Sequence, residues 1–282
     1  MARAGIDLGD GVRQFQSPLW QTNCLLVVAG AEALLCDPSY TQEELEELQD
    51  VVRDAKAERV HVLVTHADYD HVCGLAAFPE ATVVAGEATT ARIEDGAALA
   101  GLSAAATEWG IDWPLDGLRV DRAVTPGEVR LDSFRLAVVD APSHGREGAC
   151  FVLLDQGVLF PGDHLSPITT PLIGGSLEAA VRANRALLEA LDDHDLRWVV
   201  PGHGRALTPE EAREIGEADL AYLERLRDAA GEASDRQLAP GWALLHAYAV
   251  EPPRPDTDDF AVYGIRAGNA QLALTEAREA VA

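Results

Sequence analysis

The sequence of 282 residues predicts a layered α/β sandwich, a fold in which helices cover the outer faces of β-sheets. Short apolar runs bounded by glycine and proline occur in two batches, within residues 24–85 and 119–160, and are typical of strands. Longer amphipathic stretches with helical spacing lie between and after these batches. Hydrophobic residues make up 48% of the chain and charged residues 24%, which is typical of a globular protein and not of a disordered chain.

The first batch is predicted to open with a β-hairpin, because Cys24–Ala29 and Ala33–Asp37 are apolar runs joined by a short turn that contains glycine. A helix is expected over Thr41–Ala57, because its first residue and Glu44 have the spacing of a capping box. The rest of this half is expected to contain, in order, a buried strand over Val60–Val64, a strand over Thr82–Ala85 and an alanine-rich helical segment over Gly86–Gly110.

The second half is predicted to contain further strands and then helices. The expected strands are Arg119–Val124, Glu128–Leu131, Phe134–Asp140, Ala149–Leu154, Val158–Phe160 and Arg197–Val200. A helix is expected over Leu177–Leu191, because leucines recur there on one face. From Thr208 onward the pattern is helical, with Glu211 completing a second capping box and a final helix around Asp259–Ala280.

A cluster of metal-ligating residue types lies in the segment Thr65–His71, directly after a predicted buried strand. The segment holds two imidazoles, His66 and His71, and two carboxylates, Asp68 and Asp70. Side chains of these types at the exit of a strand usually bind a metal or take part in catalysis. The segment is therefore predicted to form one half of a metal site.

Three more residues of the same types follow predicted strands farther along the chain: His144, Asp163 and His203. Each stands beside glycine or proline, which are small or rigid and let loops crowd around one point. We therefore expect the four segments to meet at one site. A Ser-His-Asp triad built on Ser143 is disfavoured, because the chain has no G-x-S-x-G turn there and the other ligand-type residues would have no role.

The order of these segments resembles the pattern of the metallo-β-lactamase superfamily of metal-dependent hydrolases: H-x-H-x-D-H, a lone His, an Asp in a G-D turn and a His in a G-H-G turn. The resemblance covers about Asn23 to Gly204 and fails at one position, where Asp68 stands in place of the second His. It implies an α/β fold of four αββα layers. It also implies a catalytic domain over residues 1–207 and a helical extension over residues 208–282, packed on the substrate side.

The resemblance further implies two divalent metal ions at one edge of the sheets. Their predicted ligands are His66, Asp68 and His144 for metal one and Asp70, His71 and His203 for metal two, with Asp163 as the bridge. Asp70 and Asp163 are also the predicted catalytic residues. Imidazole and carboxylate ligands suit zinc, and also iron or manganese. The implied nucleophile is a hydroxide held between the metals, since metal binding lowers the pKa of water to ~7.

Asp68 bears on the choice between two chemistries. A carboxylate at this position makes the site a weaker Lewis acid than a neutral His would, and it favours iron or manganese. The main expectation is a hydrolase of small ester-like substrates, such as thioesters or lactones. The alternative is a diiron oxidoreductase, because flavodiiron proteins of the same superfamily carry Glu at the position of Asp68. Against this alternative, no flavodoxin-like domain fits in the chain after Gly204. A third hypothesis, a degenerate binding protein, conflicts with the otherwise intact ligand set.

Substrate choice is expected to reside in the helical tail, as in the glyoxalase-II-like thioesterases that the chain resembles in this respect. Candidate pocket residues are Tyr222, Trp242, Tyr248, Tyr263 and Arg266 in the tail, and His164 beside the predicted bridge. Ordinary packing between tail and core is the alternative for each aromatic residue. Cys73 either lies near the metals or is simply a small buried residue.

The composition restricts the class of partner. A formal net charge of −25 repels phosphate backbones, so nucleic-acid substrates are disfavoured and a small-molecule substrate is expected. No apolar run approaches the ~18 residues that a membrane helix needs, and the first residues lack the apolar core of a signal peptide. A cytoplasmic protein without a membrane partner is expected, with its four cysteines reduced. The sequence leaves the oligomeric state open.

Overall fold

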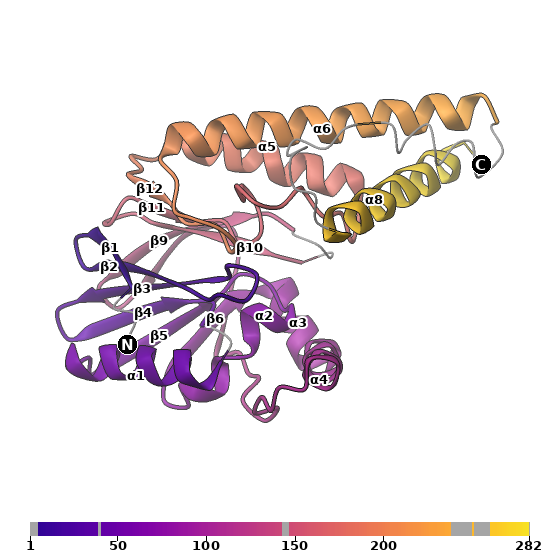
Figure 1. Cartoon of the computed structure of the whole chain (residues 1–282). Coiled ribbons are helices and arrows are strands. Elements are labelled where there is room, and N and C mark those ends of the chain that lie inside the picture. The colour runs from indigo at the N-terminus through magenta and orange to yellow at the C-terminus, as the bar shows by residue number, and fades with distance from the viewer. Residues whose placement is uncertain (1–4, 39–40, 143–146, 238–249, 251–259, 282) are drawn as a thin grey trace.

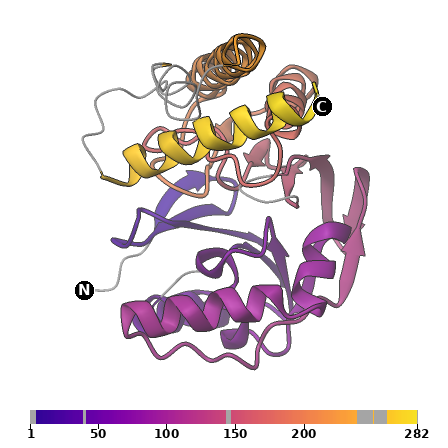
Figure 2. The ribbon, with the colours of Figure 1, turned by 90° about the vertical axis from the view of Figure 1, so that its right-hand side faces the viewer.

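Two β-sheets lie face to face in the computed structural model, and helices cover the outer face of each (Figure 1). The structure describes residues 5–38, 41–142, 147–237, 250 and 260–281. The view turned by 90° shows the same order of layers, helix–sheet–sheet–helix (Figure 2). This αββα arrangement confirms the predicted fold class.

The first sheet contains seven strands that follow one another in chain order: β1 (Ile6–Gly9), β2 (Val12–Gln16), β3 (Asn23–Ala29), β4 (Glu32–Cys36), β5 (Arg59–Val64), β6 (Thr82–Gly86) and β7 (Arg122–Val124). Strands β1 to β4 are antiparallel, including the predicted hairpin, and β4 to β7 are parallel. The sequence did not indicate β1 and β2. Gln14 is buried in β2 and Gln16 is partly buried, so the strand lacks an apolar signal.

The second sheet contains β8 (Gly127–Leu131), β9 (Phe134–Asp140), β10 (Ala149–Leu153), β11 (Val158–Phe160) and β12 (Trp198–Val199), in the order β12-β11-β10-β9-β8. Each of these matches a predicted strand to within about a residue or two. The prediction for Arg119–Val124 was too long, because only its last three residues pair with β6. The Arg119 guanidinium instead donates to the carbonyls of Phe78, Pro79 and Ala81, which holds this segment outside the ladder.

The helices on the first sheet are α1 (Gln42–Asp54), α2 (Tyr69–Val72), α3 (Glu87–Glu94) and α4 (Ala97–Trp109), with a 3₁₀ turn over Leu75–Ala77. The predicted helical segment Gly86–Gly110 consists of two helices, because Gly96 between them has φ +85°, a left-handed conformation that ends α3. The second sheet is covered by α5 (Leu177–Asp193) and the start of α6 (Pro209–Asp235), and α8 (Phe260–Glu279) packs against these two helices. Both predicted capping boxes form, at Thr41 and at Thr208.

Three apolar clusters fill the spaces between the layers. One joins α1 to the first sheet, a second fills the space between the two sheets, and a third joins α5 and the start of α6 to the second sheet. A fourth cluster, which includes Tyr222, Leu226 and Ala270, packs α6 against α5 and α8. Figure 1 shows that α6 and α8 reach well past the edge of the sheets. Among the described residues, no helix has both the length and the apolar character needed to span a bilayer.

Candidate metal site

The described ligand-type residues of the sequence pattern lie where strands end. His66 and Asp68 follow β5, and Asp70 and His71 occupy the short helix α2. Asp163 lies three residues after β11 and His203 four residues after β12. Within the described residues, the structure thus brings these side chains together from both sheets, as the sequence analysis expected. His144 lies outside the described residues. The assignment of each residue as a metal ligand stays a prediction.

Asp70, His71 and His203 form the first of two groups of ligand atoms. Their nearest nitrogen and oxygen atoms all lie within 4.8 Å of one another. Asp70 Oδ2 is 3.5 Å from His71 Nε2 and 3.3 Å from His203 Nε2. Asp163 adds one oxygen, since its Oδ1 lies 3.0 Å from His71 Nε2 and 3.3 Å from His203 Nε2. This is the residue set that the sequence pattern assigns to metal two.

The second group contains His66 and Asp68. His66 Nε2 lies 3.8 Å from Asp68 Oδ2 and 3.8 Å from the other oxygen of Asp163, Oδ2. The two oxygens of Asp163 therefore face two different groups of donors. This geometry fits the predicted bridge, because a carboxylate whose oxygens point to two ions joins them.

The donor chemistry fits divalent cations. His66, His71 and His203 are at most 8% exposed, and Asp70 is 8% exposed, so the donors converge in a buried space. Three imidazoles with three carboxylates are the nitrogen and oxygen ligands that zinc, iron and manganese accept. The residues present therefore fit the metal ions that the sequence pattern implies.

Electrostatics within the cluster are strong. Burial alone lowers the pKa of His203, but the Asp163 and Asp70 carboxylates outweigh it and raise that pKa to about 10. The pKa of His71 is also raised well above its usual value, because Asp163, Asp70 and Asp37 together outweigh its burial. Burial raises the pKa of Asp70, yet the two imidazoles overcome this effect and hold it at about 2. These raised pKa values favour the protonated forms of His71 and His203 without metal, so a metal ion displaces protons from them when it binds.

Asp37 supports both histidines of the Thr65–His71 segment, and the sequence analysis missed it. Its Oδ2 lies 2.8 Å from His71 Nδ1 and accepts the hydroxyl proton of Thr65 at 2.5 Å. The same hydroxyl oxygen lies 3.0 Å from His66 Nδ1. An ionised carboxylate only accepts hydrogen bonds, so Nδ1 of His71 carries a proton, and in the neutral ring that would bind metal the lone pair of Nε2 faces the cluster. The available signal was an acidic residue at the very end of a buried strand, before Pro38.

The turn that carries His203 depends on two residues that the sequence analysis did not assign. Asn23, which is fully buried, donates from Nδ2 to the carbonyls of Pro201 and Gly204 at 2.7 and 2.6 Å. Gly202 has no room for a side chain, because a Cβ there would lie 2.5 Å from Asp163 Oδ1. The close packing of this turn against Asp163 therefore requires glycine at that position.

The remaining candidates behave mostly as packing residues. Cys73 is buried in an apolar cluster beside Trp113, and burial raises the pKa of its thiol, which supports the packing interpretation. The Tyr222 hydroxyl accepts a hydrogen bond from Asn269 at 3.1 Å and is buried between α6 and α8. His164 Nε2 lies 3.2 Å from the carbonyl oxygen of Ala141. The side chains of Trp242, Tyr248 and Tyr263 lie outside the described part.

A separate group of ligand-type side chains consists of Glu32, His61 and Asp132. The Arg59 guanidinium already pairs with both carboxylates, and His61 Nε2 lies 3.1 Å from Asp132 Oδ2. This group is an ion-pair network that joins the two sheets.

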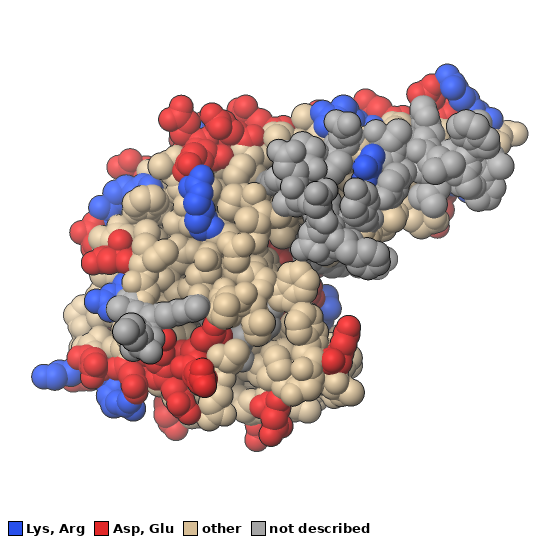
Figure 3. Space-filling view, in the orientation of Figure 1, with Lys and Arg blue, Asp and Glu red and all other residues tan. Residues whose placement is uncertain are grey.

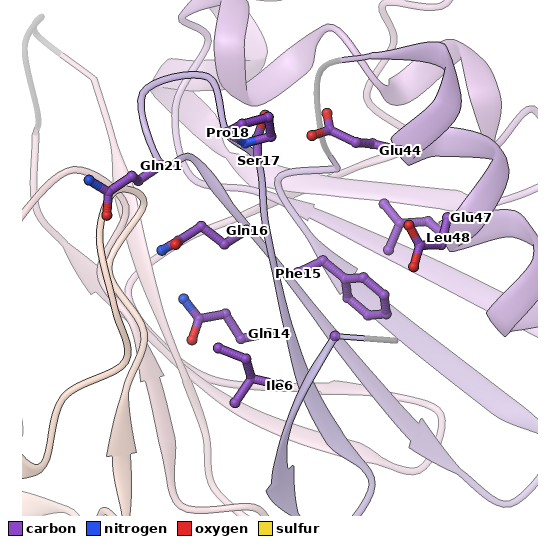
Figure 4. Close-up of a pocket in the computed structure, with 11 residues that line it drawn as sticks. Ile6, Gln14, Phe15, Gln16, Ser17, Pro18, Gln21, Glu44, Glu47 and Leu48 are labelled. Carbon is purple, nitrogen blue, oxygen red and sulfur yellow. The ribbon is translucent and has the colours of Figure 1, made fainter. Parts of the chain in front are cut away.

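A cavity of about 480 Å³ lies between β2, the loop after it and α1 (Figure 4). Gln14, Gln16 and Gln21 line it from one side, and Glu44 and Glu47 from α1 line the other. None of the described residues around it is a predicted ligand. The cavity is therefore distinct from the ligand cluster.

Comparison with known proteins identifies the family. The sequence profile described as "Metallo-beta-lactamase superfamily" matches residues 17–203, about two thirds of the chain. The chain belongs to the metallo-beta-lactamase superfamily. The match spans every predicted ligand, and this superfamily is a family of metal-dependent hydrolases whose fold implies divalent metal binding. No curated protein matches the chain.

Solved structures share the superfamily fold at low sequence identity. A metallo-beta-lactamase family protein from Thermus thermophilus superimposes with a TM-score of 0.66 at 19% identity, over 98% of this chain and 96% of that one. BLEG-1 B3 metallo-beta-lactamase gives a TM-score of 0.57 at 21% identity, over 72% of this chain and 96% of that one. The metallo-beta-lactamase FIM-1 from Pseudomonas aeruginosa, solved in its mono-zinc form, gives a TM-score of 0.54 at 18% identity, over 76% of this chain and 94% of that one. The Thermus alignment therefore extends into the C-terminal helices. The comparisons do not favour the diiron oxidoreductase alternative.

Proposed function

We propose that this protein is a dinuclear metal-dependent hydrolase of a small ester-like substrate, with a thioester or a lactone as the first choice. The observation that carries the proposal is the position of Asp163. Its Oδ1 lies 3.0 Å from His71 Nε2, whereas its Oδ2 lies 3.8 Å from His66 Nε2. One carboxylate thus serves two groups of ligands, which supports two ions and not one. We expect zinc, with iron or manganese as the alternatives that the oxygen ligand Asp68 favours.

The metals, when bound, would lower the pKa of water to ~7 and polarise the carbonyl oxygen of the substrate. The ligand residues fix where this happens. His71 and His203 would hold one ion with Asp70, and His66, Asp68 and His144 would hold the other. Asp70 would complete the first of these ligand sets through Oδ2, which faces both imidazoles, and its low pKa of about 2 keeps the carboxylate ionised as a ligand. The leaving thiol or alcohol takes up a proton as the acyl bond breaks.

The surroundings of the cluster suit a substrate with an apolar part. The carbonyl oxygen of Trp20 lies 2.9 Å from His203 Nδ1, so this residue is a direct neighbour of the predicted ligand. Its indole is 45% exposed and packs edge-to-face against Trp109, with the ring centroids 5.8 Å apart. Exposed aromatic pairs beside a reactive site are common contact surfaces for apolar groups.

The helical extension also contacts a loop that leads away from the cluster. After Asp163, the chain runs to α5 through Pro171 and Ile173. Asn269 of α8 accepts from the Ile173 backbone N–H at 2.9 Å and donates to the carbonyl oxygen of Pro171 at 2.8 Å. This contact supports the proposal that residues 208–282 lie on the substrate side.

Acidic side chains gather over α1 (Figure 3), which is consistent with a small-molecule substrate and unfavourable for nucleic acid.

The test combines metal analysis with an activity panel. We expect two ions per chain after reconstitution, and turnover of thioesters or lactones in preference to phosphodiesters and sulfate esters. Asp163→Asn should lower the metal content and abolish turnover, whereas the control Asp228→Asn, at a side chain that is 78% exposed on α6, should change neither. Less than one ion per chain, or full occupancy in Asp163→Asn, would refute the mechanism.

A further inference from the structure

Among the described residues, each oxygen of the Asp68 carboxylate faces a partner. Its Oδ2 lies 3.8 Å from His66 Nε2, on the side of the ligand cluster. Its Oδ1 accepts a hydrogen bond from Arg92 Nη2 at 3.1 Å. Arg92 belongs to α3, which begins directly after strand β6, and its side chain is 33% exposed. The residue that departs from the family pattern therefore has a dedicated cationic partner.

The same guanidinium has a second contact that closes a ring. Arg92 Nη1 donates to Glu147 Oε1 at 3.1 Å, and this oxygen also accepts the backbone N–H of Ala67 at 3.2 Å. Ala67 lies between His66 and Asp68 in the chain. Glu147 is only 6% exposed, so the ring is well protected from solvent on this side. Arg92 thus connects the Asp68 side chain to the backbone that carries it.

The geometry of arginine suits this role. A guanidinium presents its N–H groups in a rigid planar fork, so it fixes the direction of a carboxylate and not only its charge. With Oδ1 held by Arg92, the Oδ2 atom of Asp68 is left facing His66. Glu147 also follows His144 by three residues in the sequence. The ring therefore includes the segment of His66 and Asp68, and through Glu147 it is close in sequence to His144, the other predicted ligand of metal one.

We propose that Arg92 is the positioning residue of metal one: it orients Asp68 so that a carboxylate replaces the family's usual imidazole as a ligand. This inference rests on the proposed dinuclear site. Groups that orient metal ligands typically contribute 10- to 100-fold in metal affinity. Arg92 contacts the Asp68 side chain directly and, through Glu147, the backbone of Ala67, so it should affect metal one and leave metal two unchanged.

The experiment is a titration of the metal-free full-length protein with Zn²⁺ in competition with a chromophoric chelator. In Arg92→Gln we expect the affinity for one of the two ions to fall by about 10- to 100-fold, while the affinity for the other stays within about twofold. Arg213→Gln is the matched control, because Arg213 is 34% exposed and pairs with Asp192, between α6 and α5. The control should bind both ions as the unmodified protein does.

A double-mutant cycle separates positioning from a general effect of charge. In an Asp68→Ala background, Arg92→Gln should cause a clearly smaller further loss than in the unmodified protein, because the side chain that Arg92 orients is already absent. Additive losses, or unchanged binding in Arg92→Gln, would overturn the proposal. If Arg92→Gln does not fold, Arg92→Lys carries the same test, since it keeps the charge and loses the fork. Binding of one ion to the unmodified protein would reject the dinuclear site and with it the role of Arg92, whereas binding of none would reject metal-dependent hydrolysis altogether.

Discussion

The contact between Asp37 and His71 gives the sharpest prediction, which is for the substitution Asp37→Asn. Asparagine keeps the shape of the side chain and tolerates the left-handed backbone of Asp37, which has φ +47°. Its amide has one acceptor oxygen, so it cannot accept at both oxygen positions of the carboxylate. If the oxygen keeps the Thr65 N–H bond of 2.9 Å, the NH₂ group faces His71 Nδ1. His71 must then move its proton to Nε2, the atom that faces the ligand cluster.

The magnitude follows from this change of tautomer. A hydrogen bond to a charged group contributes about 1.5–3 kcal/mol, and loss of such an orienting group typically lowers metal affinity by about 10- to 100-fold. We therefore expect the affinity of the ion bound by His71 to fall by about 10- to 100-fold, or about 1.4–2.7 kcal/mol at 1.36 kcal/mol per factor of ten. Chelator competition measures the affinity, and the ¹⁵N chemical shifts of the His71 ring report the tautomer.

The chain offers a closely matched control. Asp132 also has a left-handed backbone, with φ +50°, and its Oδ2 lies 3.1 Å from Nε2 of the buried His61, away from the ligand cluster. Asp132→Asn should leave the affinity for both ions within about twofold of the unmodified protein. The reasoning fails if Asp37→Asn binds metal as tightly as Asp132→Asn does, or if the His71 ring keeps its proton on Nδ1.

Three further predictions concern the same cluster. Gly202→Ala places a Cβ 2.5 Å from Asp163 Oδ1, so we expect metal analysis to show loss of dinuclear binding. Thermal unfolding should show a loss of about 1–3 kcal/mol in stability. In the control Gly231→Ala, where the new Cβ has open space, neither the metal content nor the stability should fall. Asp68→His should raise the preference for zinc over manganese in a competition titration, and unchanged selectivity would show that Asp68 is not a ligand. The folded-state pKa of His203, about 10, exceeds its ordinary value of 6.5, so its stabilisation of the metal-free protein is complete below pH 6.5 and is lost as the pH rises toward 10. The stability of the chelator-treated protein should thus fall between pH 7 and 10, while the affinity for zinc rises. A stability that does not change over this pH range would contradict the raised pKa of His203.

Local sequence signals were sufficient for much of the fold. Apolar runs bounded by glycine and proline identified most strands of both sheets, and the spacing of Thr41 with Glu44 located the start of α1. These signals succeed because they depend on residues within one or two turns of each other. The unpredicted strands β1 and β2 are the exception. Glutamine and charged residues conceal the alternation in β2, β1 is only four residues long, and the pairing of β1 with β2 and of β2 with β3 makes the extended conformation favourable.

The sequence by itself determined which residue types stand at the predicted metal site and in what order, because strand exits with their glycine and proline neighbours are local features. Only the tertiary structure decided what holds those residues in place. Asp68 meets Arg92 across 24 residues, Arg92 meets Glu147 across 55, and Asn23 meets the turn of His203 across about 180. Such contacts leave no periodic trace in the sequence, since the fold alone brings the partners within hydrogen-bond distance. These orienting contacts are the features through which this chain is expected to tune its metals.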